Sequence, residues 1–308
     1  MNPHNIDPAS WFDDVPVIGK LSHQEMVAAL RELGDNETAD AVEAANSPFE
    51  STVKSLFQPK PWQHTSYAFG YLPTNTAGQS EIPIQHSGTV TPDLTLKNSQ
   101  IKITLDCLRI ASYPGGGTHQ ILFDFYAQNQ LSGNVEHLHF NNTYRVQEGQ
   151  RAAILGYPIF IGLNVGNEGV AFKCFTVNVK NSQDESFLGF LDSDVFKSGL
   201  KLASALQPAI GPLSQMALGI TKSIATHNNN KAVQEFYLGL DFSNVATRAR
   251  LAEGSYLAVQ IPESSEAIWD WSKWVYNPTN GQVTNKDNPQ RLIPFNYIVF
   301  SISRYQEA

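Results

Sequence analysis

The chain contains 308 residues, of which 42% are hydrophobic and 16% are charged, and its formal net charge is -8. The apolar content is sufficient for a core, and the low content of charged residues is unlike that of disordered chains. Because Lys and Arg are scattered along an acidic chain, the sequence lacks the basic surface that nucleic acids require. We therefore expect no nucleic-acid partner.

The N-terminal sequence MNPHNIDPASWFDDV lacks the basic and apolar segments of a secretory signal peptide. No apolar run of about 18 residues is present, which excludes a single membrane-spanning helix. We expect a soluble, cytoplasmic protein, and we leave non-classical export open. Cys107 and Cys174 each lie in a strand-like run. We expect two buried thiols in a reducing compartment, with one disulfide between two strands as the alternative.

Residues 1–62 predict an N-terminal helical segment followed by a linker. Ser22 and Glu25 have the spacing of a capping box at the start of a helix. Apolar residues then recur at helical spacing, namely Met26, Leu30 and Leu33. A second helix is expected over 37–45, with Asn36 as its N-cap. The apolar face of this helical pair is too small for an independent core, so we expect docking on the rest of the chain, with docking on a partner as the alternative.

From residue 63 onward the hydrophobic pattern changes to a period of two, which predicts strands. Within 100–111, alternation places four side chains on one face, namely Ile101, Ile103, Leu105 and Cys107. Leu108 and Ile110 break this alternation, which predicts either a β-bulge or a strand covered on both faces. Before residue 180 the predicted strands are 66–72, 80–90, 100–111, 119–128, 135–140, 152–163 and 170–179. Many short strands separated by turns are typical of an antiparallel sandwich.

Residues 187–231 interrupt the strands and predict an inserted α-helical hairpin. A first helix is expected over about 194–206, capped by Asp192 or Ser193. Pro212 is well suited to the first turn of a second helix. That helix carries an apolar stripe, which consists of Leu213, Met216, Ala217, Ile220 and Ile224.

Strand patterns resume after the insertion. The predicted strands are 233–242, 255–261, 267–276 and 293–305. The sequence therefore predicts a mainly β fold, namely an antiparallel β-sandwich over 63–308 with the helical hairpin inserted at about 187–231 and the N-terminal helical segment preceding it.

The inserted hairpin is the first candidate for function. The stripe residues Leu213, Met216, Ile220 and Ile224 would contact a partner protein or a membrane, with Lys197 and Lys201 at the headgroup surface. The alternative is that the hairpin covers a face of the sandwich and has only a structural role.

Two histidines are the second candidate. His137 and His139 lie on one face of a predicted strand, at a spacing that suits a metal ion if His119 or Asp124 converges on them. This arrangement would fit a metal-dependent hydrolase. The alternative is a pair of histidines that either face the solvent or are hydrogen-bonded within the protein.

An aromatic cluster is the third candidate. Trp269 and Trp271 would stack against a carbohydrate, but a regular strand places them on the face opposite Trp274 and Tyr276. Core packing is therefore the preferred interpretation.

No nucleophile motif and no phosphate-binding loop is recognisable in the sequence. We therefore predict a non-enzymatic binding or effector module that engages a partner protein or a membrane through its helical insertion and N-terminal helices. We expect no cofactor. The sequence does not predict the oligomeric state.

Overall fold

The computed structural model describes residues 15–45, 59–74, 78–131, 134–154, 156–180, 199–202, 210–227, 229–243, 245 and 248–306, excepting the side chains at 131, 134 and 210–216. Over these residues the fold is mainly β, as the sequence predicts. The α-helices are α1 (His23–Glu32), α2 (Asn36–Ala45) and α6 (Ile210–Thr226). No helix in the described ranges is long and apolar enough to cross a membrane.

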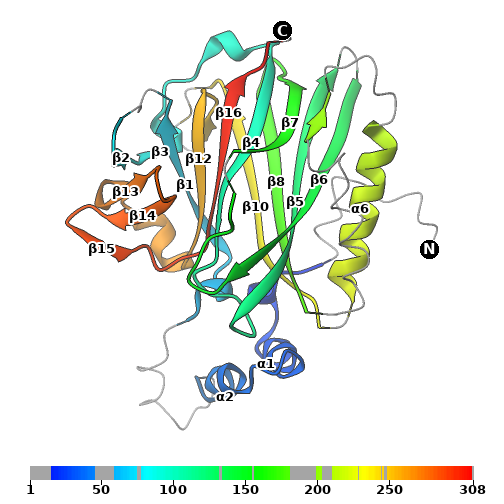
Figure 1. Cartoon of the computed structure of the whole chain (residues 1–308), viewed down its shortest axis with the longest axis vertical. Coiled ribbons are helices and arrows are strands. Elements are labelled where there is room, and N and C mark those ends of the chain that lie inside the picture. Colours follow the sequence, from blue (N-terminus) through cyan, green and yellow to red (C-terminus); the bar gives the residue numbers. More distant parts are fainter. Residues whose placement is uncertain are drawn as a thin grey trace.

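The strands form three sheets (Figure 1). The seven-stranded sheet has the order β3 (Gln85–His86), β1 (Ser66–Pro73), β12 (Gly254–Ile261), β16 (Tyr297–Arg304), β4 (Gln100–Arg109), β7 (Tyr157–Asn164) and β9 (Leu200–Lys201). The five-stranded sheet has the order β11 (Ala249–Arg250), β10 (Lys231–Asp241), β8 (Gly169–Val179), β5 (Thr118–Leu131) and β6 (Asn134–Gln147). The four-stranded sheet has the order β15 (Asn288–Leu292), β14 (Gln282–Asn285), β13 (Trp274–Asn277) and β2 (Ile82–Pro83).

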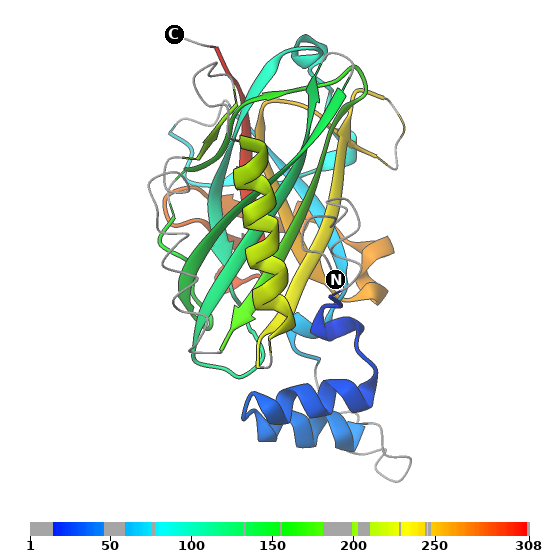
Figure 2. The same ribbon diagram turned by 90° about the vertical axis from the view of Figure 1, so that its right-hand side faces the viewer.

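Three hydrophobic clusters hold these layers together. The largest contains side chains from both large sheets, and the Phe125 and Phe300 rings meet there with centroids 5.3 Å apart. A second cluster lies between the five-stranded sheet and α6, which covers one face of that sheet (Figure 2). The third joins the seven-stranded sheet to the four-stranded sheet. The seven-stranded sheet is therefore covered on both faces, which explains why β16 is apolar throughout its centre.

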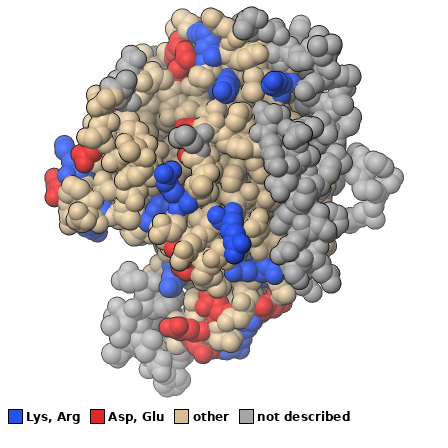
Figure 3. All heavy atoms as spheres, viewed as in Figure 1, with Lys and Arg blue, Asp and Glu red and all other residues tan. Residues whose placement is uncertain are grey.

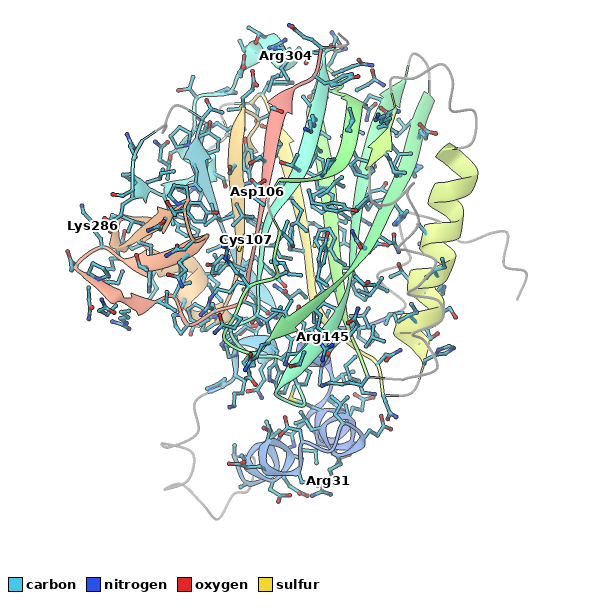
Figure 4. The ribbon with its side chains drawn as sticks, viewed as in Figure 1. Arg31, Asp106, Cys107, Arg145, Lys286 and Arg304 are labelled. Atoms are coloured by element: carbon cyan, nitrogen blue, oxygen red, sulfur yellow. The ribbon has the colours of Figure 1, made fainter. Side chains whose placement is uncertain are left out.

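A β-bulge in β4 changes the face of Cys107. Leu105 pairs with Phe300 and Cys107 with Val299, so Asp106 is the extra residue. The expectation that Cys107 shares a face with Leu105 was therefore wrong, because the thiol packs in the cluster against the four-stranded sheet. Figure 4 labels Asp106 and Cys107 next to one another on β4. Cys107 and Cys174 are both buried and free, as expected.

The N-terminal helices dock on the body of the chain. The predicted capping box of Ser22 and Glu25 is present. The cap of α2 is Asp35 and not Asn36, since the Thr38 N–H donates to Asp35 Oδ1 at 3.3 Å. The second carboxylate oxygen of Asp35 accepts from the Gly115 N–H at 3.0 Å, which ties the helical pair to the turn before β5. Figure 1 shows α1 and α2 below the sheets.

The first helix of the predicted hairpin is wrong over residues 199–202. Leu200 and Lys201 form β9, which pairs in parallel with Phe160 and Ile161 of β7. Gly199 allows this close approach, because it has a φ of +76° and a Cβ there would lie 2.7 Å from the Pro158 carbonyl oxygen. The rest of the predicted first helix lies outside the described residues. The second helix is present as α6.

Several strand predictions were only partly correct. The strand predicted over 152–163 begins only at Tyr157, and the one predicted over 293–305 begins only at Tyr297. Over 267–276 the chain forms 3-10 turns at Glu263–Ile268 and Trp271–Lys273 before β13 begins at Trp274. Asp270 causes the interruption, since its carboxylate accepts from the Ser272 N–H at 3.0 Å and closes a turn. Over 80–90 the strand divides into β2 and β3, followed by a 3-10 turn at Ser87–Thr89.

Candidate functional site

The predicted histidine pair lies on the face of the five-stranded sheet that α6 covers. His139 Nδ1 is 3.0 Å from Asp124 Oδ1, and the two side chains are 1% and 0% exposed. His137 Nδ1 forms a hydrogen bond with the Tyr126 hydroxyl. Asp124 therefore contacts only His139, whereas His137 bonds to Tyr126, so the two histidines do not share a third ligand.

A polar network joins this pair to α6. The Thr221 hydroxyl donates to Asp124 Oδ2 at 3.1 Å. Asn141 Nδ2 donates to the same hydroxyl and to the Ala217 carbonyl oxygen, the latter at 3.0 Å. His119, the other proposed ligand, lies 3.3 Å from Asn178 Oδ1 within a separate buried group. Across the described residues, no group of three or more His, Cys, Asp or Glu side chains is placed to hold a metal ion.

The apolar stripe of α6 faces the sheet where its side chains are described. Ile224 is fully buried and Ile220 is partly buried, and both pack with Phe175 and Val177 of β8. Leu213 and Met216 lie in α6, but their side chains are outside the description. Lys201 is exposed on β9, away from the stripe, and Lys197 lies outside the described residues.

The tryptophans do not follow the alternation of a strand. Trp269 stacks on Trp274 with an interplanar angle of 7° and meets Trp271 edge-on with centroids 5.5 Å apart. The expected separation of Trp274 from Trp269 was therefore wrong, because the turn at Asp270 folds the two rings together. Trp271 is 4% exposed and packs beside Gly70 of β1, where a Cβ would lie 3.0 Å from its indole ring.

A groove of about 1170 Å³ lies between β1 of the seven-stranded sheet and β10 of the five-stranded sheet. Trp269 and Trp271 line it. Tyr67 and Phe69 of β1 and Tyr237 of β10 line it as well. Residues from all three sheets or their flanking turns thus contribute to one concave surface. We call this surface the edge groove.

The side chains of Tyr67 and Phe69 pack against the β10 side of the edge groove. Their rings lie 5.3 and 5.8 Å from the ring of Phe236 on β10. The Glu235 N–H donates to the Tyr67 hydroxyl at 3.1 Å, which links the two sheets at this point. The two walls of the groove are therefore fixed relative to one another by aromatic packing and a hydrogen bond.

The outer edge of β1 faces this groove. Gln260 of β12 directs its N–H away from β1, since it donates to the Asn296 carbonyl at 2.9 Å. Because Tyr67 lies opposite Gln260, it must direct its own N–H and C=O away from β12. Phe69, two residues later, has the same orientation. These groups point toward the side of β1 on which β3 pairs only at Gly70 and Tyr71.

Carboxylates predominate among the charged groups of the edge groove. Glu263 accepts hydrogen bonds from the N–H and hydroxyl of Thr65, both at 2.7 Å. Burial alone would raise the pKa of Glu263, but the hydrogen bonds from Thr65 outweigh it and lower that pKa. Glu266 accepts from the Ser66 hydroxyl at 2.9 Å, and Glu168 is exposed.

One ion pair also lines the edge groove. Arg248 lies 3.1 Å from Asp241, so its charge is already compensated. On the face seen in Figure 3, Lys and Arg are spread over the surface, whereas acidic residues gather over α1 and α2. Because its lining holds Glu168, Glu263 and Glu266 beside one compensated ion pair, the edge groove is acidic, and a cationic ligand would be complementary to it.

The sequence did not reveal this groove. Thr65 and Glu263 meet although 198 positions separate them, and neither belongs to a recognisable motif. The alternation over 66–72 predicted a strand, but it carried no information about which strands would lie beside it. The acidic residues near the end of β12 are the only local signal.

Comparison with protein-family models, curated proteins and solved structures found no match.

Proposed function

We propose that the chain is a non-catalytic binding module that engages a partner protein, and that the edge groove is its binding site. The observation that supports the proposal is the groove of about 1170 Å³ in which aromatic rings, carboxylates and the backbone of a sheet edge meet. Concave surfaces with apolar walls and a few convergent polar groups are the usual sites of recognition.

We further infer that the two large sheets form an antiparallel β-sandwich over 63–308, to which the N-terminal segment 1–62 is attached. This inference is supported by the cluster of buried side chains that both sheets share. The edge groove would then lie along one open side of the sandwich, where the two sheets separate. The cytoplasmic location expected from the sequence is likewise a proposal, supported by the two buried free thiols.

The edge groove is a stronger candidate than the stripe on α6. Ile224 is buried against the sheet and Thr221 is bonded to Asp124, so partner or membrane binding by the stripe would require α6 to leave the sheet. The groups of the edge groove need no such rearrangement. For the metal-dependent alternative, the His139–Asp124 contact is the supporting observation, and elemental analysis of the purified protein for stoichiometric zinc would test it.

A displayed library of random dodecapeptides tests the proposal. The library is selected on the wild-type protein, and each enriched peptide is then measured against two variants. Ala267→Trp places an indole in the edge groove, because Ala267 is exposed and lines it. Ser264→Trp is the control, because Ser264 is exposed on the same 3-10 turn but does not line the groove.

We expect enriched peptides to bind the Ser264→Trp variant like the wild type and to lose at least tenfold in affinity for Ala267→Trp. Failure to enrich any peptide, or equal binding to both variants, would contradict the proposal. Groove-dependent binding of oligosaccharides in a parallel glycan array, without peptide binding, would favour the carbohydrate alternative for Trp269 and Trp271.

A further inference from the structure

We infer that the ligand of the edge groove is an extended basic peptide segment, which adds as a strand to the outer edge of β1. This inference rests on the proposed function, and it specifies the chemistry and conformation of the partner. Sheet edges recognise peptides in this way because the backbone supplies affinity while pockets for alternate side chains supply specificity.

The outer edge of β1 is only partly paired. The N–H and C=O of Tyr67 and the N–H of Phe69 point away from β12, and among the described residues none forms a hydrogen bond with them. Native proteins usually pair, cover or disrupt such an edge. Here it lies instead along a groove, where a guest strand can reach it.

The unpaired stretch of the β1 edge is short. At one end Glu263 already accepts from the Thr65 N–H, and at the other end β3 pairs with Gly70 and Tyr71. The open stretch is therefore bounded on both sides. A peptide strand added there would run in line with β3 and would need only a few residues to satisfy the edge.

A buried hydrogen-bond donor lies beside this edge. Trp271 lines the edge groove and is 4% exposed, and its indole N–H has no hydrogen-bond partner within the described part of the chain. A buried N–H without a partner is costly, and a ligand carbonyl would satisfy it once the indole turns this shielded N–H toward the groove. Trp269, also on the groove, has an indole N–H in the same condition.

The charge of the edge groove favours a basic peptide. Glu168, Glu263 and Glu266 line the groove, and the one arginine among the lining residues is paired with Asp241. Lysine or arginine side chains that alternate along an added strand would lie near these carboxylates. An acidic segment would be repelled both by the groove and by the net charge of -8.

Four synthetic decapeptides test the inference by titration calorimetry at low salt. The parent alternates lysine and valine, and a second peptide replaces lysine by glutamate. The remaining two are the parent N-methylated either at every lysine or at every valine. Alternate residues of a strand direct their N–H groups to opposite edges, so only one methylated set faces β1.

We expect the parent to bind, the acidic peptide to bind at least tenfold more weakly, and one methylated peptide to lose at least tenfold while the other retains binding. Glu263→Gln and Glu266→Gln should each weaken the parent about two- to fivefold, as for exposed ion pairs. Glu37→Gln and Asp287→Asn, which neutralise exposed carboxylates outside the groove, should leave binding unchanged.

The outcomes separate the two proposals. Equal binding of the acidic peptide would overturn the preference for basic ligands, and retention of both methylated peptides would overturn strand addition. In either case the edge groove survives as the binding site if Ala267→Trp still blocks binding. If the parent does not bind, while library peptides without basic residues bind in a groove-dependent way, the basic-strand inference is overturned and the proposed binding site is retained. Binding that is unchanged by Ala267→Trp overturns both the proposed function and the basic-strand inference.

Discussion

At the scale of single residues, a buried polar network joins α6 to the five-stranded sheet. Asp124 is fully buried and satisfied by His139 and Thr221, and Asn141 completes the link to α6. The sequence pattern placed both histidines on one face correctly, because strand alternation is local. It could not identify Thr221 as a partner of Asp124, since the contact depends on how α6 lies on the sheet.

Thr221→Val should destabilise the protein by about 1–3 kcal/mol, because it preserves the shape of the side chain but removes a hydrogen bond from a buried carboxylate. Thr226→Val on the same helix is the control, since Thr226 is exposed and bonds only locally to its own helix, and its effect should stay within about 0.5 kcal/mol. Urea unfolding monitored by circular dichroism measures both. Equal free energies of unfolding for the two variants would show that the network contributes nothing.

Buried histidines make stability depend on pH. Burial lowers the pKa of His119, and the nearby Lys180 acts in the same direction. Burial also lowers the pKa of His64. The unfolded chain, in which histidine titrates near pH 6.5, therefore binds protons more readily than the folded chain. This contribution to stability is complete above about pH 6.5 and decreases as the pH falls below that value.

We expect the free energy of unfolding of the wild type to decrease between about pH 7 and pH 5, and to decrease less in His119→Gln. The comparison is of slopes, so a uniform loss of stability in the variant does not affect it. Identical slopes would mean that the pKa of His119 is the same in the folded and the unfolded chain.

At the scale of elements, prediction succeeded where the local pattern alone decides the structure. The capping box of α1, the second helix of the insertion and most strands follow from short-range periodicity. It failed where a side chain closes a turn, as Asp270 does, or where long-range pairing overrides helix propensity, as at Leu200 and Lys201. In both cases the competing interaction is absent from the pattern of apolar residues.

The cap of α2 provides a test at this scale. Asp35→Ala should cost about 1–2 kcal/mol, because Asp35 both caps α2 and accepts from the Gly115 N–H. Asn36→Ala should have little effect, although the sequence suggested Asn36 as the cap, since Asn36 is exposed within the helix. Thermal unfolding compares them. A larger loss for Asn36→Ala would contradict the capping described here.

At the scale of the whole molecule, the order of strands creates the site. β1 is next to the end of the seven-stranded sheet, with only the two-residue β3 beyond it, and β10 is likewise followed only by the two-residue β11. The edge groove lies between these two incompletely covered edges. The alternation in each strand could be recognised from sequence, but the pairing of distant strands could not, and neither could the groove.

Amide hydrogen exchange, resolved by residue with NMR, tests the central claim most directly. In the free protein the account predicts fast exchange at Tyr67 and Phe69 and slow exchange at Ala68, whose N–H faces β12. Addition of the lysine–valine decapeptide should slow Tyr67 and Phe69 while leaving Ala68 unchanged. Slow exchange at Tyr67 and Phe69 in the free protein would mean that another part of the chain already covers the β1 edge, and it would contradict the account.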